Sequence, residues 1–302
     1  MKDNMKLFEK IYVPAALALA LTAAVSCSDK DDENSGWTEP IKVATYNIQY
    51  DDKSVEAGKW DNRKELMQQM LKDCDFDIFG AQEPYKFQVE DIVSWFPEYA
   101  WVGTSIAGET EKERIHYNPI FYKKDRFSVL DNGMFWYSET PDVPNSKGWD
   151  SYSVRMCNWV KFKDNKSGKI FFHFNSHFDH IGETARLESA RLLVSKVKEI
   201  AGDYPSFCTA DYNADQTSAP YQIIIMSALM DSYSKAQYRS GDGVRSYNGY
   251  SQATANSSDS RIDHIFISRG TKVYTWSLLC KSYDGKFASD HNPIVIQWSL
   301  PR

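Results

Sequence analysis

Cysteines are scarce in this chain of 302 residues, which has five and no CxxC pair. They are Cys27, Cys74, Cys157, Cys208 and Cys280. The wide spacing of the last four argues against a zinc site and against thioredoxin-like redox chemistry. We expect these four to be free thiols buried in apolar segments, with a disulfide as the alternative in an oxidising compartment.

Long apolar runs and an excess of basic charge are also missing. The longest apolar run, Ile11 to Val25, is shorter than the roughly 20 residues that a membrane-spanning helix needs. The net charge is −6, from 35 basic and 41 acidic side chains, so the chain as a whole has no electrostatic attraction to nucleic acid or anionic membranes. No segment repeats at intervals of about 20–50 residues, which excludes a solenoid or a propeller.

The composition that is present is typical of globular proteins. Hydrophobic residues make up 42% and charged residues 25%, and the length suffices for one large domain or two ordinary ones. Aromatic residues reach 14%, which favours a fold rich in strands. No linker rich in Pro or Gly divides residues 40–302, so we expect one domain there.

The N-terminus has the pattern of an export signal. Three lysines precede the apolar run, and the small residues Ala24 to Ser26 precede Cys27. This junction resembles the lipobox of bacterial lipoproteins, which predicts a signal peptide over residues 1–26 and a lipid on Cys27. The alternative is a plain secretory signal.

Residues 27–39 are polar and predict a flexible tether. The acidic run after Cys27 resembles the surface-export signal of Bacteroidetes lipoproteins. We therefore expect an outer-membrane lipoprotein of the cell envelope that faces outward, with a periplasmic location or a merely solvated linker as alternatives.

Apolar patterns predict a mixture of strands and helices. Predicted strands cover residues 41–48, 76–80, 119–122, 127–137, 154–162, 169–177, 206–210, 262–268, 272–279 and 293–300. Predicted helices cover residues 61–71, 85–95, 183–201 and 220–230. Many strands neighbour one another along the chain, which favours an α/β fold with mostly antiparallel sheets. Residues 138–152 and 239–260 are predicted to be loops.

Five short polar motifs are placed at predicted strand ends. They contain Asn47 in KVATYNI, Glu83 in DIFGAQEP, His177 in FFHFNSHFDH, Asp211 and Asn213 in CTADYNAD, and Asp290 with His291 in ASDHNPIV. Strand ends in a layered sheet fold meet at one edge, so acidic, amide and imidazole groups there indicate a hydrolytic metal site. Taken singly, each motif also fits an ordinary turn, helix start or strand-end cap.

In their order along the chain, TYNI, AQE, SH-F, ADYN, RIDHIF and SDHNP resemble the endonuclease/exonuclease/phosphatase superfamily of deoxyribonuclease I-like enzymes. The resemblance covers residues 41–299. It is strongest to secreted Bacteroidetes members, through W-x-x-R at Trp60 and Arg63, NPIFYKK and FW-x-SETP. It implies a four-layer α/β sandwich, in which two mostly antiparallel sheets pack face to face with helices outside, and a metal-dependent phosphoester hydrolase.

The residues suit that chemistry. Phosphoester hydrolysis needs a divalent cation, a positioned water and a proton for the leaving oxygen. Glu83 offers a hard carboxylate suited to Mg²⁺, with Mn²⁺ as an alternative. The resemblance adds Asn47 and Asp290 to the metal site. It also implies that Asp211 activates or orients the attacking water and that Asn213 binds a phosphoryl oxygen or holds that water.

The resemblance gives the remaining catalytic roles to two histidines and one carboxylate. His177 and His291 would contact the phosphate and stabilise its developing charge. Asp263 in RIDHI would pair with His291 and raise its pKa. An orienting role without direct catalysis is the alternative for Asp263.

Four further residues are weaker candidates for substrate binding. Arg155 resembles a family arginine near the phosphate, with a structural salt bridge as the alternative. Asn118 and Tyr122 could line the pocket or serve in a turn and the core. His180 is expected at the substrate rim or behind the primary groups.

One position departs from the family pattern. Ala210 stands where a glycine usually precedes the catalytic aspartate, with Tyr212 in place of phenylalanine. We expect the extra methyl group to be tolerated, with a narrower pocket as the alternative.

The predicted rim loops favour a small substrate. Residues 51–59, 104–114, 138–152 and 239–260 are mixed or acidic and carry aromatic side chains. Aromatic groups with few cations suit a small phosphorylated substrate, such as an organic phosphate, a sugar phosphate or a lipid headgroup, better than duplex DNA. The alternatives are a secreted nuclease, since aromatic groups also stack single-stranded bases, and a non-catalytic binding or adhesion lipoprotein of the same fold. We expect a monomer that meets the membrane only through its lipid.

Overall fold

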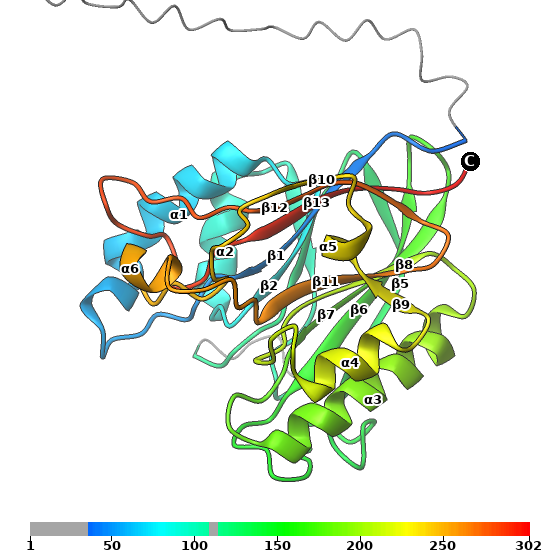
Figure 1. The fold of residues 1–302 in the computed structure, drawn as a ribbon, viewed down its shortest axis with the longest axis horizontal. Coiled ribbons are helices and arrows are strands. Elements are labelled where there is room, and N and C mark those ends of the chain that lie inside the picture. The colour runs from blue at the N-terminus through cyan, green and yellow to red at the C-terminus, as the bar shows by residue number, and fades with distance from the viewer. Residues whose placement is uncertain (1–35, 109–113) are drawn as a thin grey trace, which may run out of the picture. The chain divides into compact units, whose positions relative to one another are not determined.

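Two β-sheets packed face to face form the centre of the protein (Figure 1). The computed structural model describes residues 36–108 and 114–302, which form one unit. The predicted signal peptide, most of the tether and Cys27 lie outside the described residues, so their boundaries stay predictions. Within the described ranges no helix is long and apolar enough to cross a membrane.

The first sheet has the order β10-β12-β13-β1-β2-β4-β3. These strands are Tyr238–Ser240, Lys272–Leu278, Ile294–Ser299, Ile41–Asn47, Ile78–Gln82, Ile120–Lys123 and Tyr99–Val102. The second sheet has the order β5-β6-β7-β8-β11-β9. These strands are Phe127–Trp136, Met156–Asp164, Ile170–His177, Ser206–Asp211, Asp263–Ser268 and Leu229–Asp231. The parallel pairs are β1–β2, β7–β8 and β10–β12, and the other pairs are antiparallel.

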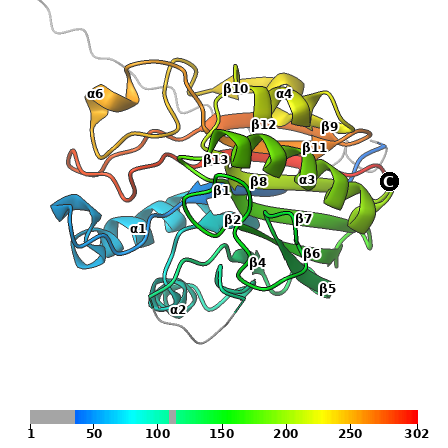
Figure 2. The same cartoon turned by 90° about the horizontal axis from the view of Figure 1, so that it is seen from below.

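Helices cover the outer faces of both sheets (Figure 2). The 3-10 turn η1 (Glu56–Gly58), α1 (Trp60–Cys74) and α2 (Lys86–Trp95) belong to the first sheet's side, and α3 (Glu183–Ala201) and α4 (Ala219–Ile225) cover the second. Two single-turn helices, α5 (Ser232–Lys235) and α6 (Gln252–Ala255), lie in the C-terminal third. Apolar side chains fill the space between the sheets and both spaces between sheet and helices. The predicted four-layer sandwich is confirmed.

Helix α3 illustrates how the sequence produces an outer layer. Ala190, Leu193 and Val197 recur at helical spacing and pack on the second sheet. The carboxylate of Asp150, from a distant loop, accepts hydrogen bonds from the first-turn amides of the helix, one of them Ala185 N at 2.6 Å. The helix ends at Gly202, which has a positive φ of 56° that glycine adopts readily.

The inward-facing positions of the central strands change from apolar to polar along each strand. In order toward one edge they are Ile41, Val43, Thr45 and Asn47 on β1, Ile78, Gly80 and Gln82 on β2, Phe171, His173, Asn175 and His177 on β7, Phe207, Thr209 and Asp211 on β8, and Ile267, Ile265 and Asp263 on β11. Alternation along a strand places every second residue on the same face. The two sheets therefore present the last inward polar group of each of these strands at one edge.

A buried polar layer separates that edge from the apolar core. Gln82 donates to Asn175 Oδ1 at 2.7 Å, Thr209 donates to the same oxygen at 2.9 Å, and His173 pairs with Thr209 at 2.7 Å. Gly80 lies directly against this layer, where an added Cβ would come within 2.2 Å of Thr209 Oγ1. Glycine is required there because the two sheets approach closely, and the resulting network fixes how the sheets align beneath the polar edge.

Two predicted elements differ from the structure. The predicted helix over 220–230 ends at Ile225, and Leu229–Asp231 forms strand β9 against β11. Pairing with a sheet edge outweighs the apolar helical pattern there. The predicted loop 239–260 contains the end of β10 and helix α6.

Candidate active site

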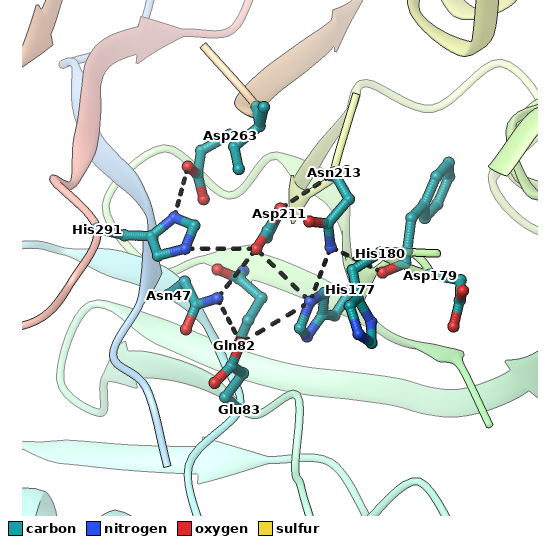
Figure 3. A network of polar contacts seen from close by, with 12 residues as sticks. Asn47, Gln82, Glu83, His177, Asp179, His180, Asp211, Asn213, Asp263 and His291 are labelled. Atoms are coloured by element: carbon teal, nitrogen blue, oxygen red, sulfur yellow. Dashed lines mark hydrogen bonds and ion pairs between the residues drawn. The ribbon is translucent and has the colours of Figure 1, made fainter. Parts of the chain in front are cut away.

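A cleft of about 760 Å³ opens at the polar edge of the two sheets. Its lining includes Glu83, His177, Asp211, Asn213, Asp290 and His291. In Figure 3 the side chains of Glu83, His177, Asp211, Asn213 and His291 converge on one place, with Asp263 next to His291. Strand pairing explains the convergence, since Asp211 is the register partner of both His177 and Asp263.

Carboxylates are crowded at the floor of the cleft. Asn47 Nδ2 donates to Glu83 Oε1 at 2.9 Å and to Asp211 Oδ2 at 3.0 Å, so one amide group bridges two acids. Asn47 Oδ1 accepts from the backbone amide of Gln49 at 3.0 Å. In this arrangement Asn47 presents its amide nitrogen to both acids and its oxygen to the backbone, and its role as a metal ligand stays a prediction.

The crowding shifts the acids away from their ordinary behaviour. Burial and the neighbouring carboxylate of Asp263 raise the pKa of Asp211 to about 7. Burial raises the pKa of Asp290 to about 6. The charge of His291 lowers this pKa and, to a smaller extent, the charge of Glu83 raises it, and both effects are smaller than that of burial. These carboxylates are held close together in an environment that favours a cation.

Two of the histidines that line the cleft, His177 and His291, have opposite environments. Burial, followed by the nearby Arg155, lowers the pKa of His177 well below its ordinary value, so its ring is neutral. His177 Nε2 lies 3.1 Å from Asn213 Nδ2, a contact in which the neutral ring accepts. Burial would also lower the pKa of His291, but the carboxylates of Asp263 and Asp211 outweigh it and raise that pKa well above its usual value. His291 Nδ1 donates to Asp263 at 2.9 Å, and its Nε2 lies 3.7 Å from Asp211 (Figure 3).

Two site residues have strained backbones. Glu83 and Asn213 have positive φ values of 74° and 47°, which residues other than glycine seldom adopt. The positive φ lets Asn213 N donate to Asp211 Oδ1 at 2.9 Å in a tight turn, while its side chain reaches His177. Strain of this kind persists where the surrounding structure requires a particular side-chain direction, which is typical of functional sites.

Hydrogen bonds from neighbouring side chains hold Asp290 and the segment after β1 in place. Gln49 Nε2 donates to Asp290 Oδ2 at 2.9 Å, and Tyr250 in turn donates to Gln49 Oε1. The Ser289 hydroxyl donates to Asn47 O at 2.7 Å. Asp290 therefore lies in the cleft with its carboxylate already held by this bridge.

Beneath these contacts lies Arg63 of α1, which is buried and points all its donors at backbone oxygens. The five acceptors are the carbonyls of Gly58, Ile48, Ala288, Gln49 and Tyr50, at 2.6 to 3.0 Å. One side chain thus joins the segment that follows Asn47 to the segment that precedes Asp290.

Arg155 and His180 border the cleft next to His177. Arg155 Nη2 lies 3.0 Å from His180 Nδ1, and arginine can only donate, so Nδ1 accepts and the imidazole proton sits on Nε2. Burial and Arg155 lower the pKa of His180, which agrees with a neutral ring. Asp179 lies 3.5 Å from Arg155 Nε, so the salt bridge proposed as an alternative exists and holds Arg155 at the cleft.

The donor set of the cleft suits a divalent cation. Ligand atoms of Glu83, His177 and Asp211 lie within 4.8 Å of one another, as do those of Asp211, Asp263 and His291. Hard carboxylate oxygens match Mg²⁺ or Mn²⁺, and Asp263 Oδ1 is buried without a hydrogen-bond partner among the described residues. The first group, at the floor of the cleft, is where a metal would be held.

Two predicted substrate-binding residues lie elsewhere. Tyr122 packs in the core between the sheets, with its ring 5.1 Å from Phe162. Asn118 is fully buried and donates to Met156 O at 3.1 Å. Neither is part of the cleft lining, because the strand that follows Asn118 carries both toward the sheet interior. Ala210 faces the apolar layer under α3 rather than the cleft, so its methyl group does not narrow the pocket.

One wall of the cleft is aromatic, and the sequence patterns did not predict it. Tyr50, Tyr85 and His116 all line it, and burial lowers the pKa of His116, which keeps that ring neutral. Tyr50 follows Asn47 by three residues and Tyr85 follows Glu83 by two. This closeness to predicted site residues could have indicated that both tyrosines border the cleft. His116 precedes β4 in a segment with no apolar pattern, and only the fold brings it to the site.

Comparison with known proteins agrees with the geometry. The model of the endonuclease/exonuclease/phosphatase family matches residues 44–291. The chain is 35% identical to a family protein of Bacteroides vulgatus of known structure, with a TM-score of 0.81 over 87% of this chain and 100% of the other. It is 36% identical to the mannosyl-6-phosphatase of Bacteroides thetaiotaomicron, with a TM-score of 0.79 over 85% and 99%.

A relative outside bacteria is also similar. An uncharacterised protein of Acanthamoeba polyphaga mimivirus is 28% identical over 260 residues, which is 79% of this chain and 91% of the other. The family model covers most of the chain, and the two Bacteroides structures share its fold at more than 30% identity. This chain therefore belongs to the endonuclease/exonuclease/phosphatase family, whose members are typically phosphoester hydrolases.

Proposed function

We propose that the chain is a divalent-metal-dependent phosphomonoesterase that removes phosphate from a small phosphorylated sugar at the cell envelope. The observation that carries the proposal is the pairing, in one cleft, of an acid with a pKa near neutrality and a protonated histidine, Asp211 and His291. A carboxylate with a pKa near neutrality can take a proton, and a histidine with a raised pKa stays positively charged. The two environments therefore suit the base and the positive partner of a hydrolytic site.

Each group in the cleft has a separate role in the proposed reaction. A bound divalent cation supplies charge neutralisation at the phosphate and would be held by Glu83 with its neighbouring acids. Asp211 takes a proton from the attacking water, and a base with a pKa near 7 is well matched to that task. Protonated His291 donates toward the phosphoryl oxygens, where negative charge develops. The water oxygen bonds to phosphorus as the P–O bond to the alcohol breaks. The proton that Asp211 took from the water passes on to the alcohol oxygen, directly or through solvent, so the products are one alcohol and one inorganic phosphate.

Two features of the cleft favour a small monoester over nucleic acid. The described arginines that line it are Arg114 and Arg155, and both have acidic partners, Asp51 and Asp179. Proteins that grip a nucleic-acid backbone use many lysines and arginines along an extended surface. The volume of about 760 Å³ lies in the range of small-molecule sites. Likeness to a mannosyl-6-phosphatase makes a hexose 6-phosphate the first substrate to try.

The envelope location rests on the sequence alone. The pattern before Cys27 resembles a lipobox, and the acidic tether after it suits export to the surface. Cys27→Ala should release the protein from the membrane fraction, and mass spectrometry of the mature N-terminus should find a diacylglyceryl cysteine in the native chain. An intact residue 1 in the purified protein would refute this part.

The test of activity uses the full chain purified in mild detergent. Mannose 6-phosphate, bis(p-nitrophenyl) phosphate and single-stranded DNA are each assayed with Mg²⁺, with Mn²⁺ and with EDTA. We expect metal-dependent release of phosphate from the monoester. Faster cleavage of the diester or the DNA would instead favour a phosphodiesterase or nuclease, and no turnover of any of them with either metal would contradict the proposal.

A further inference from the structure

Three aromatic rings meet on one wall of the cleft. Tyr50 and His116 stack with ring centroids 4.9 Å apart and an interplanar angle of 29°. Tyr85 lies 5.7 Å from His116 at 47° and 5.6 Å from Tyr50 at 48°. Each ring is within contact of the other two, so the three form one cluster, defined here as the ring wall.

The ring wall lies beside the groups that would hold phosphate. Tyr50 follows Asn47 by three residues, and Tyr85 follows Glu83 by two. Both tyrosines and His116 line the same cleft as Glu83 and Asp211. A phosphate bound over the acidic floor would therefore place the next atoms of its ester within reach of the ring wall.

The rings remain partly exposed although they are packed together. All three are half-buried, whereas most aromatic rings between sheet and helices are fully buried. Apolar surface exposed inside a concave site is typical of a place that a ligand covers. The phosphate does not need this apolar surface, because charge and hydrogen bonds recognise it. The rings are therefore available to the rest of the substrate.

The tilt between the rings indicates the shape of the partner. A flat nucleobase stacks best on one ring or between two parallel rings. The three rings are tilted by 29° to 48° to one another, so together they offer an uneven apolar surface and not one flat platform. A puckered sugar ring, whose C–H groups project from one face while its hydroxyls point to the rim, fits such a surface.

Resting on the proposed phosphomonoesterase activity, we infer that Tyr50, Tyr85 and His116 form the subsite that binds the sugar ring of the leaving alcohol and set the preference for cyclic sugar phosphates. Because the subsite acts on the alcohol and not on phosphorus, its loss should affect esters according to their alcohol.

The test compares two esters that share the phosphate and differ in the alcohol, mannose 6-phosphate and glycerol 3-phosphate. Tyr50→Ala and Tyr85→Ala should lower kcat/KM for mannose 6-phosphate about tenfold, mainly through KM, and change the value for glycerol 3-phosphate less than about twofold. Tyr50→Phe keeps the ring and should recover most of the kcat/KM for mannose 6-phosphate that Tyr50→Ala loses. Tyr238→Ala removes an exposed ring from β10, outside the cleft lining, and should leave both esters unaffected.

The outcomes separate this inference from the proposed function. Equal losses on both esters, or no loss on either, would overturn the sugar-ring subsite while wild-type turnover upheld the phosphatase. A loss confined to adenosine 5′-monophosphate, assayed in parallel, would replace the sugar with a nucleobase. If the wild-type chain hydrolyses neither ester, the proposed function fails. Calorimetric titration with mannose 6-phosphate then decides: binding lost in Tyr50→Ala supports the subsite, and binding unchanged refutes it.

Discussion

The two ends of the sandwich treat buried charge in opposite ways. At the end where β1 and β2 begin, Asp77 accepts from Arg126 at 2.6 Å, from Lys123 at 3.2 Å and from the backbone amide of Lys42 at 2.9 Å. At the end where the same strands finish, the described salt-bridge partners of Glu83 and Asp211 are histidines, not lysines or arginines. The first end neutralises its acids, and the second leaves them crowded.

That difference separates structure from function. A cavity of about 500 Å³ also lies at the first end, but three of its acids already have cationic partners. Lys123 pairs with Asp75 and Asp77, Arg126 pairs with Asp77, and Lys166 pairs with Glu39. In the cleft, burial and mutual repulsion raise the pKa of Asp211 to about 7 and of Asp290 to about 6. Such an arrangement costs stability in the free protein and is relieved when a cation binds.

Two buried arginines repeat the contrast. Arg126 sits among acids, including Asp77 and Asp164 at 3.7 Å. Arg63 donates only to backbone carbonyls of the segments that carry Asn47 and Asp290. The first arginine balances charge, and the second holds the shape of two loops.

The largest expected effect comes from removing one acid at each end. Glu83→Ala should lower kcat/KM by about 10³-fold, since it removes the main hard ligand proposed for the metal, worth roughly 4 kcal/mol of transition-state stabilisation. Its stability should be unchanged or slightly higher, because one crowded carboxylate is gone. Asp77→Ala should keep the activity and lose about 2 kcal/mol of stability, because Arg126 and Lys123 lose their partner.

Steady-state kinetics and urea unfolding measure the two quantities on the same samples. Full activity in Glu83→Ala would remove it from the metal site. A large stability loss in Glu83→Ala together with none in Asp77→Ala would reverse the comparison.

Asp263→Asn should have the next largest effect and should move the pH profile. Without the negative charge, the pKa of His291 falls, so the basic limb of kcat/KM shifts to lower pH. The pKa of Asp211 also falls, because Asp263 raises it, so the acidic limb shifts in the same direction. We expect kcat to drop about 10²-fold, and we expect the bell-shaped pH dependence of kcat/KM to move to lower pH on both sides. A uniform drop in rate with neither limb displaced would show that Asp263 has no electrostatic role.

Strand alternation explains how much of this was visible in the sequence. A run such as Ile41-Val43-Thr45-Asn47 turns polar at its last inward position, and four other strands do the same. His173 and His177 share the inner face of β7, and position along the strand separates His177, at the edge, from His173, which lies deeper and bonds Thr209. Periodicity therefore predicted the sheets, the edge and most of the residues that meet there.

Alternation along strands could not predict the features of the site that depend on the paths of loops. The positive φ of Glu83 and the five carbonyl contacts of Arg63 arise from loops whose paths the sequence does not specify. His116 reaches the cleft from an irregular segment, whereas Asn118, two residues later, is already buried. The orientation of the Asn47 amide, with its nitrogen toward the acids, follows from one backbone contact, in which Gln49 N donates to Asn47 Oδ1.

The two arginines give a smaller and sharper test. Arg63→Lys leaves three donors in place of a planar set of five, so the segments after Asn47 and before Asp290 should loosen. We expect Mn²⁺ binding, followed by electron paramagnetic resonance, to weaken about tenfold. Arg126→Lys should destabilise the fold to a similar degree and bind Mn²⁺ like wild type. Equal Mn²⁺ affinity in the two variants would show that Arg63 serves stability alone.

The smallest expected effect concerns the two faces of one strand, β8. Asp211 points into the cleft, and its neighbour Ala210 points into the apolar layer beneath α3. Ala210→Gly restores the residue that the family usually has, yet it removes a buried methyl group and frees the unfolded backbone, which should cost about 1 kcal/mol of stability. Because the methyl group faces away from the cleft, kcat and KM should stay within about twofold of wild type. A change in KM without a change in the unfolding midpoint would mean that Ala210 borders the substrate after all, and that the division of β8 into a chemical face and a packing face is wrong.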